Sequence, residues 1–435
     1  MAQSLFHGQR IAERIHGSMP IDQAAARLAP RSPRDDKLPP RLPGGNDFST
    51  AGLAARQAFL QAEYGIDVRL LNGDAGVPPA EELRGNIENL IGFAHVPIGV
   101  IGPLRVNGLY AHGDFIVPLA TTEGAMVASY HRGAYVVSQG GGVTALCLTE
   151  SVSRAPGFAF RTMIEAAQFM DWVVQHADSF SDAVEQTTSH GRLTDVKLSS
   201  CGTLVYLIFE YETGDAAGQN MVTLATDKVC RHILAQSPYQ PVRWYVEANL
   251  SGDKKASMLS FLGTRGKKVV ASAHIPSRLV ERFLHTTPAE MAEYCRVSAL
   301  GGVQSGTIGV HGHYANALAG LFIACGQDVA CVAEASVGVT QMTVDPDGAL
   351  AVSVTLPNLL VGTVGGGTHL PTAQACLAML DCVGSGRARK FAEICAATVL
   401  AGEVSIIAAM AAGDFASAHA HYRPGSRQSD ERTKT

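Results

Sequence analysis

The chain has 435 residues, of which 46% are hydrophobic and 17% are charged, and its formal net charge is −5. This balance is typical of a folded globular protein and excludes an intrinsically disordered chain. The length predicts two or three domains with a substantial buried core. The negative charge gives no indication of nucleic-acid binding.

The nine cysteines include no CxxC pair, and an odd number argues against a complete disulfide framework. Most lie in apolar stretches such as FIACGQDVACVA, so we expect buried free thiols and a reducing compartment. We expect no apolar run long enough to span a bilayer. The first residues, MAQSLFHGQRIAERIHG, lack the hydrophobic segment of a secretory signal and are expected to dock as an amphipathic helix. The sequence therefore predicts a soluble cytoplasmic protein.

The first third of the chain begins with a charged, proline-rich segment. Residues 28–46 have the composition of an extended, mobile linker. LAARQAFLQAEYG (53–65) predicts a short helix, and HVPIGVIGPLRV (95–106) predicts short strands. TTEGAMVASYHRGAYVVSQ (121–139) has helical apolar spacing, with Thr121 or Thr122 as the predicted N-cap.

The middle of the chain predicts a small α+β module. Residues 160–186 predict one or two helices, residues 195–215 a pair of strands and residues 219–236 another helix. This order favours a module inserted into a larger domain. A strand is expected at 267–276 and another at 349–362, with helices joined by glycine-rich segments over most of the remainder.

Common signature motifs give no site. No GxGxxG follows a predicted strand, and GxxxxGK[ST], HExxH and GxSxG do not occur. The HGH and HAH pairs at 311–313 and 419–421 lack a third ligand nearby, so we expect no metal.

Several charged residues stand in distinctive settings. Glu123 lies in the predicted first turn of a helix. An acidic residue at this position is explained by its favourable interaction with the helix dipole alone. Lys254 and Lys255 could be a solvated charge pair. Asp328 interrupts the apolar stretch GLFIACGQDVACVA, and a buried carboxylate needs a partner such as a lysine. The segments GDAAGQNM (214–221) and GTVGGGT (362–368) could expose backbone N–H groups to a ligand such as a phosphate, although structural turns of this composition are common.

Together, six strings resemble the catalytic portion of hydroxymethylglutaryl-CoA reductase of the eukaryote-like class I. They are ENLIG (88–92), VPIGVIGPL (96–104), PLATTEGAMVAS (118–129), DKKAS (253–257), ACGQDVA (324–330) and GTVGGGTHLPTAQACLAML (362–380). The resemblance runs from about residue 81 to residue 422 and leaves the first 50 residues without a clear match.

The resemblance implies an α+β fold with a large, mainly helical substrate domain and an inserted small ferredoxin-like cofactor domain. The expected divisions are an N-terminal extension with its linker (1–50), a helical segment (51–80), the large domain (81–156 and 246–422), the inserted domain (157–245) and a polar tail (423–435).

The implied reaction is the reduction of 3-hydroxy-3-methylglutaryl-CoA to mevalonate and CoA by two molecules of NADPH, for isoprenoid synthesis. Its catalytic residues carry over as Glu123, Lys254, Asp328 and His419. Lys254 would stabilise the oxyanion, and His419, on a C-terminal flap, would protonate the CoA thiolate. Asp328 would lie between Lys254 and Glu123, keeping the lysine charged and the glutamate protonated.

Further residues carry over as binding residues and as an interface. The implied substrate contacts are Glu88, Asn89, Ser129, Arg132, Arg154, Asn249, Lys255, Arg296 and Asn316. The implied cofactor contacts are Ser189, His190, Arg192, Asp215, Ala217, Gly218, Gln219, Asn220, Met221, Val364 and Gly365. ENLIG-type segments of the family lie at a dimer interface, so we expect a homodimer or a tetramer with shared active sites and no membrane span.

The chain departs from the family pattern at several positions. Arg296 stands where a lysine is usual, Glu247 replaces a serine, and Ala420 follows His419 where a methionine is usual. His190 aligns with the arginine that holds the extra phosphate of NADPH, so Arg192 is the expected substitute. These departures leave open an NADH-linked enzyme that oxidises mevalonate, a reductase of a related acyl-CoA and a non-catalytic paralogue that binds CoA esters.

Overall fold

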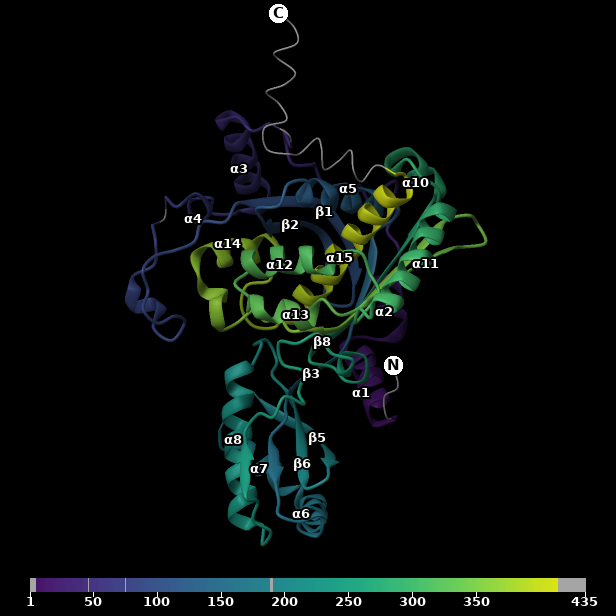
Figure 1. Cartoon of the computed structure of the whole chain (residues 1–435). Helices are drawn as coiled ribbons and strands as arrows, with labels where there is room; N and C mark the ends of the chain where they lie inside the picture. The colour runs from purple at the N-terminus through teal and green to yellow at the C-terminus, as the bar shows by residue number, and fades with distance from the viewer. Residues whose placement is uncertain (1–4, 46, 75, 188–190, 414–435) are drawn as a thin grey trace, which may run out of the picture.

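The computed structural model describes residues 5–45, 47–74, 76–187 and 191–413 (Figure 1). A larger part occupies the top of the view in Figure 1, and a smaller part lies below it. The two parts are joined by one continuous strand and by the segment in which the chain passes back from the smaller part to the larger one. The arrangement confirms the predicted α+β class.

Within the described residues, ten strands form one hydrogen-bonded sheet, in which seven follow a single path and three pair beside it. They are β1 (Ile98–Gly108), β2 (His112–Ala120), β3 (Val143–Arg154), β4 (Gly157–Ala159), β5 (Arg192–Cys201), β6 (Leu204–Glu212), β7 (Arg243–Tyr245), β8 (Gly266–Ile275), β9 (Val339–Val344) and β10 (Leu350–Leu359). Their order is β7-β4-β6-β3-β8-β10-β9, with β1 beside β2 and β3, and β5 beside β6. The pairing of β1 with β3 is parallel, whereas β3 pairs antiparallel with both β8 and β6.

Helices surround and fill the larger part and cover the smaller one. The α-helices are α1 (Leu5–Ser18), α2 (Ile21–Leu28), α3 (Thr50–Tyr64), α4 (Arg69–Asn72), α5 (Met126–Gln139), α6 (Met163–His176), α7 (Ser179–Glu185), α8 (Gln219–Gln236), α9 (Leu259–Leu262), α10 (Ser277–Leu284), α11 (Pro288–Ser305), α12 (Tyr314–Ala324), α13 (Val332–Ala335), α14 (Pro371–Met379) and α15 (Ala388–Ala411). Short 3-10 helices are η1 (Ala80–Leu83), η2 (Val329–Cys331) and η3 (Gly366–His369).

Strand β3 belongs to both parts of the molecule. From Thr144 to Ser151 it pairs with β8, and from Val152 to Arg154 it pairs with β6. We call β1, β2, β8, β9 and β10 with their helices the large part, and β4 to β7 with α6, α7 and α8 the small part. The small part has the predicted order of helices, paired strands and helix. A capping box of Thr162 and Glu165 starts α6, because each side chain bonds the other residue's backbone N–H.

The core of the large part is built on α15, which is buried on nearly every face. Within the described residues, α15 is also a helix long and apolar enough to cross a membrane, so the prediction that no apolar run reaches that length is wrong. Most of the helix is covered by α5, α12, β3 and β8, as expected of a core helix.

Three further expectations are settled by the described residues. All nine cysteines are free, and seven of them are buried, as predicted. The helix expected from Thr121 instead begins at Met126 with Ala125 at its N-cap, so that prediction of the cap is wrong. The segment around Arg31 is not a free linker, because the Arg31 backbone N–H donates to the Gly141 carbonyl at 2.8 Å.

Helices α5 and α15 cross at two glycines. A Cβ on Gly133 would lie 1.8 Å from the Ala401 carbonyl oxygen, and one on Gly402 would lie 2.1 Å from the Tyr130 ring. Because the clash at Gly133 is with backbone, neither helix can accommodate a side chain there without moving.

We expect Gly133→Ala to lower the free energy of unfolding by about 3 kcal/mol through overpacking. Gly301→Ala in α11 is the matched control, because a Cβ there meets nothing within 4 Å. It should raise stability by about 0.5–1 kcal/mol through helix propensity. Urea unfolding monitored by circular dichroism distinguishes the two, and equal stabilities would contradict the close crossing.

Candidate active site

The loop that carries Lys254 has an unusual backbone. It connects β7 to α9, and both Asn249 and Lys254 have positive φ angles, of 68° and 55°. Residues other than glycine adopt this left-handed conformation at a cost and need support from their surroundings. Such strain in a segment predicted to be catalytic supports a functional reason for the position of Lys254.

Lys254 and Asp328 meet, as predicted. The Lys254 Nζ atom lies 2.7 Å from an Asp328 carboxylate oxygen, and the other oxygen accepts from the Ala330 backbone N–H at the start of η2. The hydrogen bond that Lys254 donates to the Asp328 carboxylate raises the pKa of Lys254 despite partial burial. The expectation that Asp328 is buried is wrong, because the two side chains are 42% and 40% exposed.

A carboxylate next to Lys254 anchors the loop. Asp253 lies 2.8 Å from the guanidinium of Arg154 and 2.8 Å from that of Arg265, and it accepts from the Gln219 amide at 3.3 Å. Burial opposes its ionisation, but the two arginines prevail and lower the pKa of Asp253. Arg154, predicted to contact substrate, is buried here and supports the lysine loop.

Arg265 and Glu334 form a buried ion pair that the sequence analysis missed. Glu334, on α13, is fully buried and bonds one end of the Arg265 guanidinium, while the other end bonds Gln219 and Asp253. Burial outweighs the arginine and raises the pKa of Glu334. These residues are far apart in the chain, and nothing in the local sequence around either one signals the pairing.

The two glycine-rich segments singled out in the sequence lie side by side. Thr363 donates its backbone N–H to the Asp215 carbonyl at 2.8 Å, and Ala216 forms a bridge with Val364. A Cβ on Gly362 would come within 2.6 Å of the Ala217 backbone nitrogen, so this contact requires glycine. The Gly362 N–H also donates to the Gln327 side chain at 2.9 Å, which joins the segments to the turn carrying Asp328.

The residues predicted to bind the cofactor separate into two groups. Ala217 and Gly218 form the turn before α8, Gln219, Asn220 and Met221 begin that helix, and Val364 and Gly365 lie in the adjacent segment. The Asp215 carboxylate instead accepts from the backbone N–H groups of Gly386 and Ala388 near the start of α15. Arg192 is exposed and paired with Glu212 at 3.0 Å. Ser189 and His190 lie outside the described residues.

The residues predicted to bind substrate are dispersed. Ser129 and Arg132 on α5 both bond Ser405 of α15. Arg296 on α11 is exposed and paired with Glu293.

The remaining predicted substrate residues lie on loops or helix starts. Asn316 lies in the first turn of α12, where its N–H donates to the His313 carbonyl. Lys255 bonds the Asp253 carbonyl, and Asn249 donates its N–H to Glu247. Glu88 and Asn89 are exposed beside Asn86, which bonds the Gly366 carbonyl.

Glu123, a further predicted catalytic residue, is not joined to this pair. Glu123 is exposed in the turn between β2 and α5, where its N–H donates to the Thr121 hydroxyl. Among the described residues, the ion pair of Lys254 extends to Asp328 and not to Glu123. His419 lies outside the described residues.

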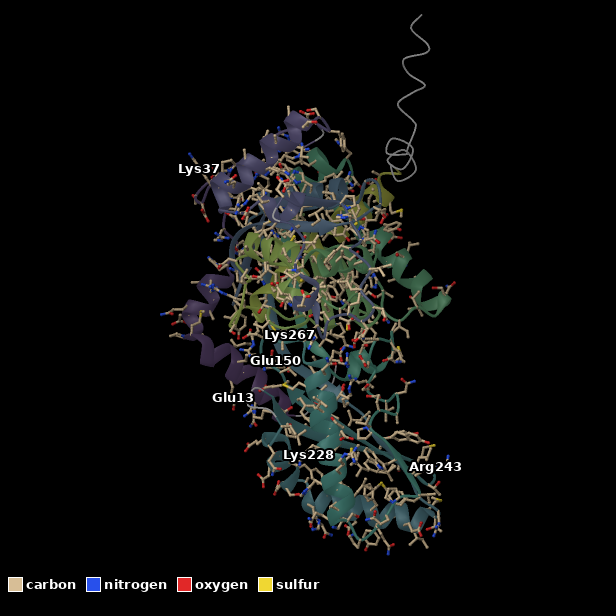
Figure 2. All side chains as sticks on the ribbon, turned by 90° about the vertical axis from the view of Figure 1, so that its left-hand side faces the viewer. Glu13, Lys37, Glu150, Lys228, Arg243 and Lys267 are labelled. Atoms are coloured by element: carbon tan, nitrogen blue, oxygen red, sulfur yellow. The ribbon has the colours of Figure 1, made fainter. Side chains whose placement is uncertain are left out.

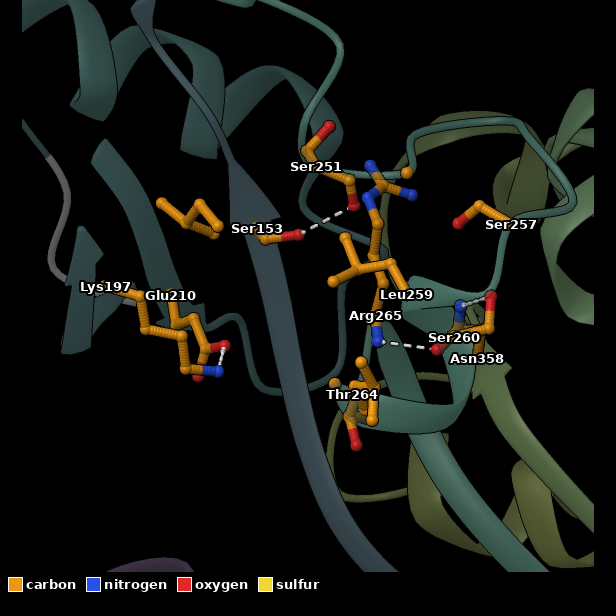
Figure 3. A pocket seen from close by; sticks show the side chains of 14 residues that line it. Ser153, Lys197, Glu210, Ser251, Ser257, Leu259, Ser260, Thr264, Arg265 and Asn358 are labelled. Atoms are coloured by element: carbon orange, nitrogen blue, oxygen red, sulfur yellow. Dashed lines mark hydrogen bonds and ion pairs between the residues drawn. The ribbon is translucent and has the colours of Figure 1, made fainter. Parts of the chain in front are cut away.

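A cavity of about 200 Å³ opens beneath the lysine loop (Figure 3). It lies between β3, β5 and β6 on one side and the segment from Ser251 to Arg265 on the other. The ion pair of Lys197 and Glu210 lines its outer side. Lys254 and Asp328 are not among its lining residues, so the cavity lies behind the loop rather than at the lysine head.

The histidine pair at 311–313 has a structural partner. Glu403 of α15 is fully buried and accepts from the His313 ring and from the backbone N–H groups of Gly312 and His313. In the described part of the chain, one group of side chains has the spacing of metal ligands: His274, Asp345 and Asp347, at the end of β8 remote from the lysine loop. His274 and Asp347 are exposed.

Comparison with known proteins finds one family. The profile described as hydroxymethylglutaryl-coenzyme A reductase matches residues 52–423. A Pyrococcus abyssi protein named 3-hydroxy-3-methylglutaryl-coenzyme A reductase is 42% identical over 372 residues, covering 84% of this chain and 90% of that protein. The protein of that name from Haloferax volcanii is 39% identical over 402 residues, covering 91% and 98%.

A solved structure has a similar fold. The class II 3-hydroxy-3-methylglutaryl-CoA reductase from Streptococcus pneumoniae, bound to NADPH in open conformations, matches with a TM-score of 0.69. It is 17% identical and covers 85% of this chain and 100% of its own. This likeness concerns the fold.

We expect Asp328→Asn to lower the pKa of Lys254, because the carboxylate that raises it is removed. The amide oxygen can still accept from the Ala330 N–H, so the turn should persist. Acylation of lysine amines as a function of pH, read by mass spectrometry, should show Lys254 reacting at lower pH than in the parent chain. Lys255 in the same peptide is the internal control, and an unchanged Lys254 profile would contradict the assignment.

Proposed function

The chain belongs to the hydroxymethylglutaryl-coenzyme A reductase family, and we propose that it reduces 3-hydroxy-3-methylglutaryl-CoA to mevalonate and CoA with two molecules of NADPH. The observation that carries this proposal is the pair of Lys254 and Asp328, held beside two glycine-rich turns. In this pair, Asp328 keeps the Lys254 ammonium positively charged. The turns expose backbone N–H groups that a ligand can approach closely.

Lys254 has the properties needed to stabilise an oxyanion. Attack of hydride on a thioester carbonyl places negative charge on the oxygen, and a fixed ammonium group beside it lowers the barrier. Asp328 keeps that ammonium charged, and the network around Asp253 fixes the loop in position. The same group would stabilise the second alkoxide, when the aldehyde intermediate is reduced.

The reaction also requires two protons. Departure of CoA needs a proton on the thiolate sulfur, for which we propose His419. Reduction of the aldehyde needs a proton on its oxygen, for which we propose Glu123. Because Glu123 is exposed in the turn after β2, bound substrate would have to bring the carboxyl close to the reacting oxygen.

The paired glycine-rich turns are the proposed site for the dinucleotide. When bound there, NADPH supplies the hydride. The close approach of Gly362 to the Ala217 backbone and the start of α8 at Gln219 suit a phosphate, because backbone N–H groups at a helix N-terminus favour anions. Arg192, exposed at the start of β5, is the proposed contact for the additional phosphate of NADPH.

Self-association is also proposed, on the basis of exposed apolar side chains. Ile87, Ile91 and Phe93 are exposed in and around the ENLIG segment, and Val297, Leu300 and Val303 form an exposed stripe on α11. Large apolar groups gathered in this way are typical of interfaces between subunits. A dimer or tetramer would place Arg296, on the same helix, at the contact between copies.

Lys254→Ala should lower kcat with the hydroxymethylglutaryl thioester and NADPH by about a hundredfold or more, because the oxyanion loses its cation. The oxidation of NADPH is followed spectrophotometrically with purified protein. Lys228→Ala, an exposed lysine on α8, is the control and should retain parent activity. A well-folded, active Lys254→Ala protein would show that another group stabilises the oxyanion.

Arg192→Ala should weaken the use of NADPH by about tenfold in KM and leave NADH nearly unchanged, because one charge-assisted contact to a phosphate is lost. Steady-state kinetics with each dinucleotide measure the ratio. If the KM for NADH rises by the same factor, Arg192 does not contact the additional phosphate of NADPH.

A further inference from the structure

The N-terminal segment lies outside the matched family region yet is anchored to the large part. The family profile begins at residue 52. Before it, Arg27 donates to the Gly108 carbonyl at 3.0 Å, and Arg31 donates to the Asn107 side chain at 2.7 Å. The Arg31 carbonyl in turn accepts from Arg105 at 2.9 Å. These bonds fix the end of α2 and the residues that follow it against β1.

Helix α1 reaches from this anchor to the junction of the two parts. In Figure 1 it lies beside β3, where the small part meets the large one. The guanidinium of Arg14 lies 3.4 Å from Glu150 and 3.1 Å from Glu212. The Arg14 side chain is only 10% exposed, and Glu150 and Glu212 are 7% and 21% exposed. Little solvent therefore screens the two contacts.

The two carboxylates belong to different parts of the molecule. Glu150 lies in the section of β3 that pairs with β8, directly opposite Lys267. Glu212 ends β6, which pairs with β3 only beyond Ser151. Arg14 therefore links the large part to the small part across the point where β3 changes partners.

The link continues to the turn before α8. Lys267 lies 3.6 Å from Glu150 and donates to the Gly214 carbonyl at 3.3 Å (Figure 2 shows Glu150 beside Lys267). Gly214 follows Glu212 by two residues and begins the turn that leads to Gln219. Arg389, at the start of α15, also bonds Glu150. Arg14, Glu150 and Lys267 thus form one chain of contacts from α1 to this turn.

We propose that helix α1 is a clamp between the two parts and that Arg14 is a positioning residue for the dinucleotide-binding turn Gly214–Gly218. The inference rests on the proposed function, because it assigns the dinucleotide to that turn. Because Arg14 pairs with both Glu150 and Glu212, it limits movement of the small part relative to the large part. The turn is thereby kept in the conformation that binds the dinucleotide. Its loss should therefore weaken binding of both NADPH and NADH.

The clamp can be opened without unfolding the protein. Removing Arg14 leaves Glu150 with Lys267 and Arg389, and Glu212 with Arg192, so neither carboxylate becomes an uncompensated charge. Glu150 is a buried member of this network rather than a surface charge, because its side chain is only 7% exposed. Burial alone would raise the pKa of Glu150, but the surrounding cations Lys267, Arg389 and Arg14 lower it to about 2.

The test is dinucleotide binding by Arg14→Ala, with Glu13→Ala, an exposed neighbour on the same helix, as the control. Fluorescence titration should give Kd values for NADPH and NADH that are each weakened about three- to tenfold, the range expected for coupling through a network. The control should bind as the parent chain does. Glu212→Gln should weaken NADH binding similarly, and combining it with Arg14→Ala should add little.

Hydrogen exchange provides a readout that is independent of ligand. Amides of residues 212–220 should exchange faster in Arg14→Ala than in the parent or Glu13→Ala chain. Unchanged exchange there, or unchanged affinity for both dinucleotides, would overturn the clamp. A loss for NADPH alone would also overturn it, since that pattern belongs to Arg192. If the parent chain binds neither dinucleotide, the proposed function fails, while hydrogen exchange still decides the clamp.

Discussion

The position of Lys254 depends on the carboxylate beside it. Asp253 is shared by the guanidinium groups of Arg154 and Arg265, each 2.8 Å away. Arg154 comes from β3, and Arg265 immediately precedes β8, so the loop is tied to two neighbouring strands of the central sheet. Removing Arg265 would leave the buried carboxylate of Glu334 without its cation, so this arginine in particular holds the arrangement together. This constraint holds the strained backbone at Lys254 in place.

The exposure of the lysine pair limits what it can do alone. With about two-fifths of each side chain exposed, water screens the field of Lys254 and Asp328. Under the proposed mechanism, a substrate that covers the pair would displace that water and strengthen the attraction between the ammonium and a developing oxyanion. The free chain thus holds the two charged groups in position, and bound substrate would supply the low-dielectric surroundings that the proposed mechanism needs.

Local patterns predicted most elements, whereas the pairing of Lys254 with Asp328 was implied by the family resemblance. The strand pair, the helices of the small part and the core helix α15 all follow from apolar periodicity. The same reasoning placed Asp328 inside the core, since it read the apolar stretch as continuous. In the structure α12 ends at Ala324, and Asp328 follows in an exposed turn. Apolar periodicity predicts that a helix is present but does not predict the residue at which the helix ends.

Long-range polar contacts could not be predicted in this way. Arg265 and Glu334 are 69 residues apart, and each alone would be read as a surface charge. Likewise, the composition of residues 28–46 indicates a linker, but Arg31 finds its acceptors on β1 only after the sheet has formed. Such pairs depend on tertiary packing. A single sequence gives information on tertiary packing only where it resembles a family of known fold.

Two charge networks converge on the same short turn. Lys267, bonded to the Arg14 and Glu150 network, holds the Gly214 carbonyl at one end of the turn. Gln219, bonded to Asp253 and Arg265, holds the other end where α8 begins. Because Asp253 also anchors the lysine loop, a shift of the turn cannot occur without disturbing the bonds that position Lys254. The turn proposed for the dinucleotide and the proposed catalytic lysine are therefore mechanically coupled through charged side chains.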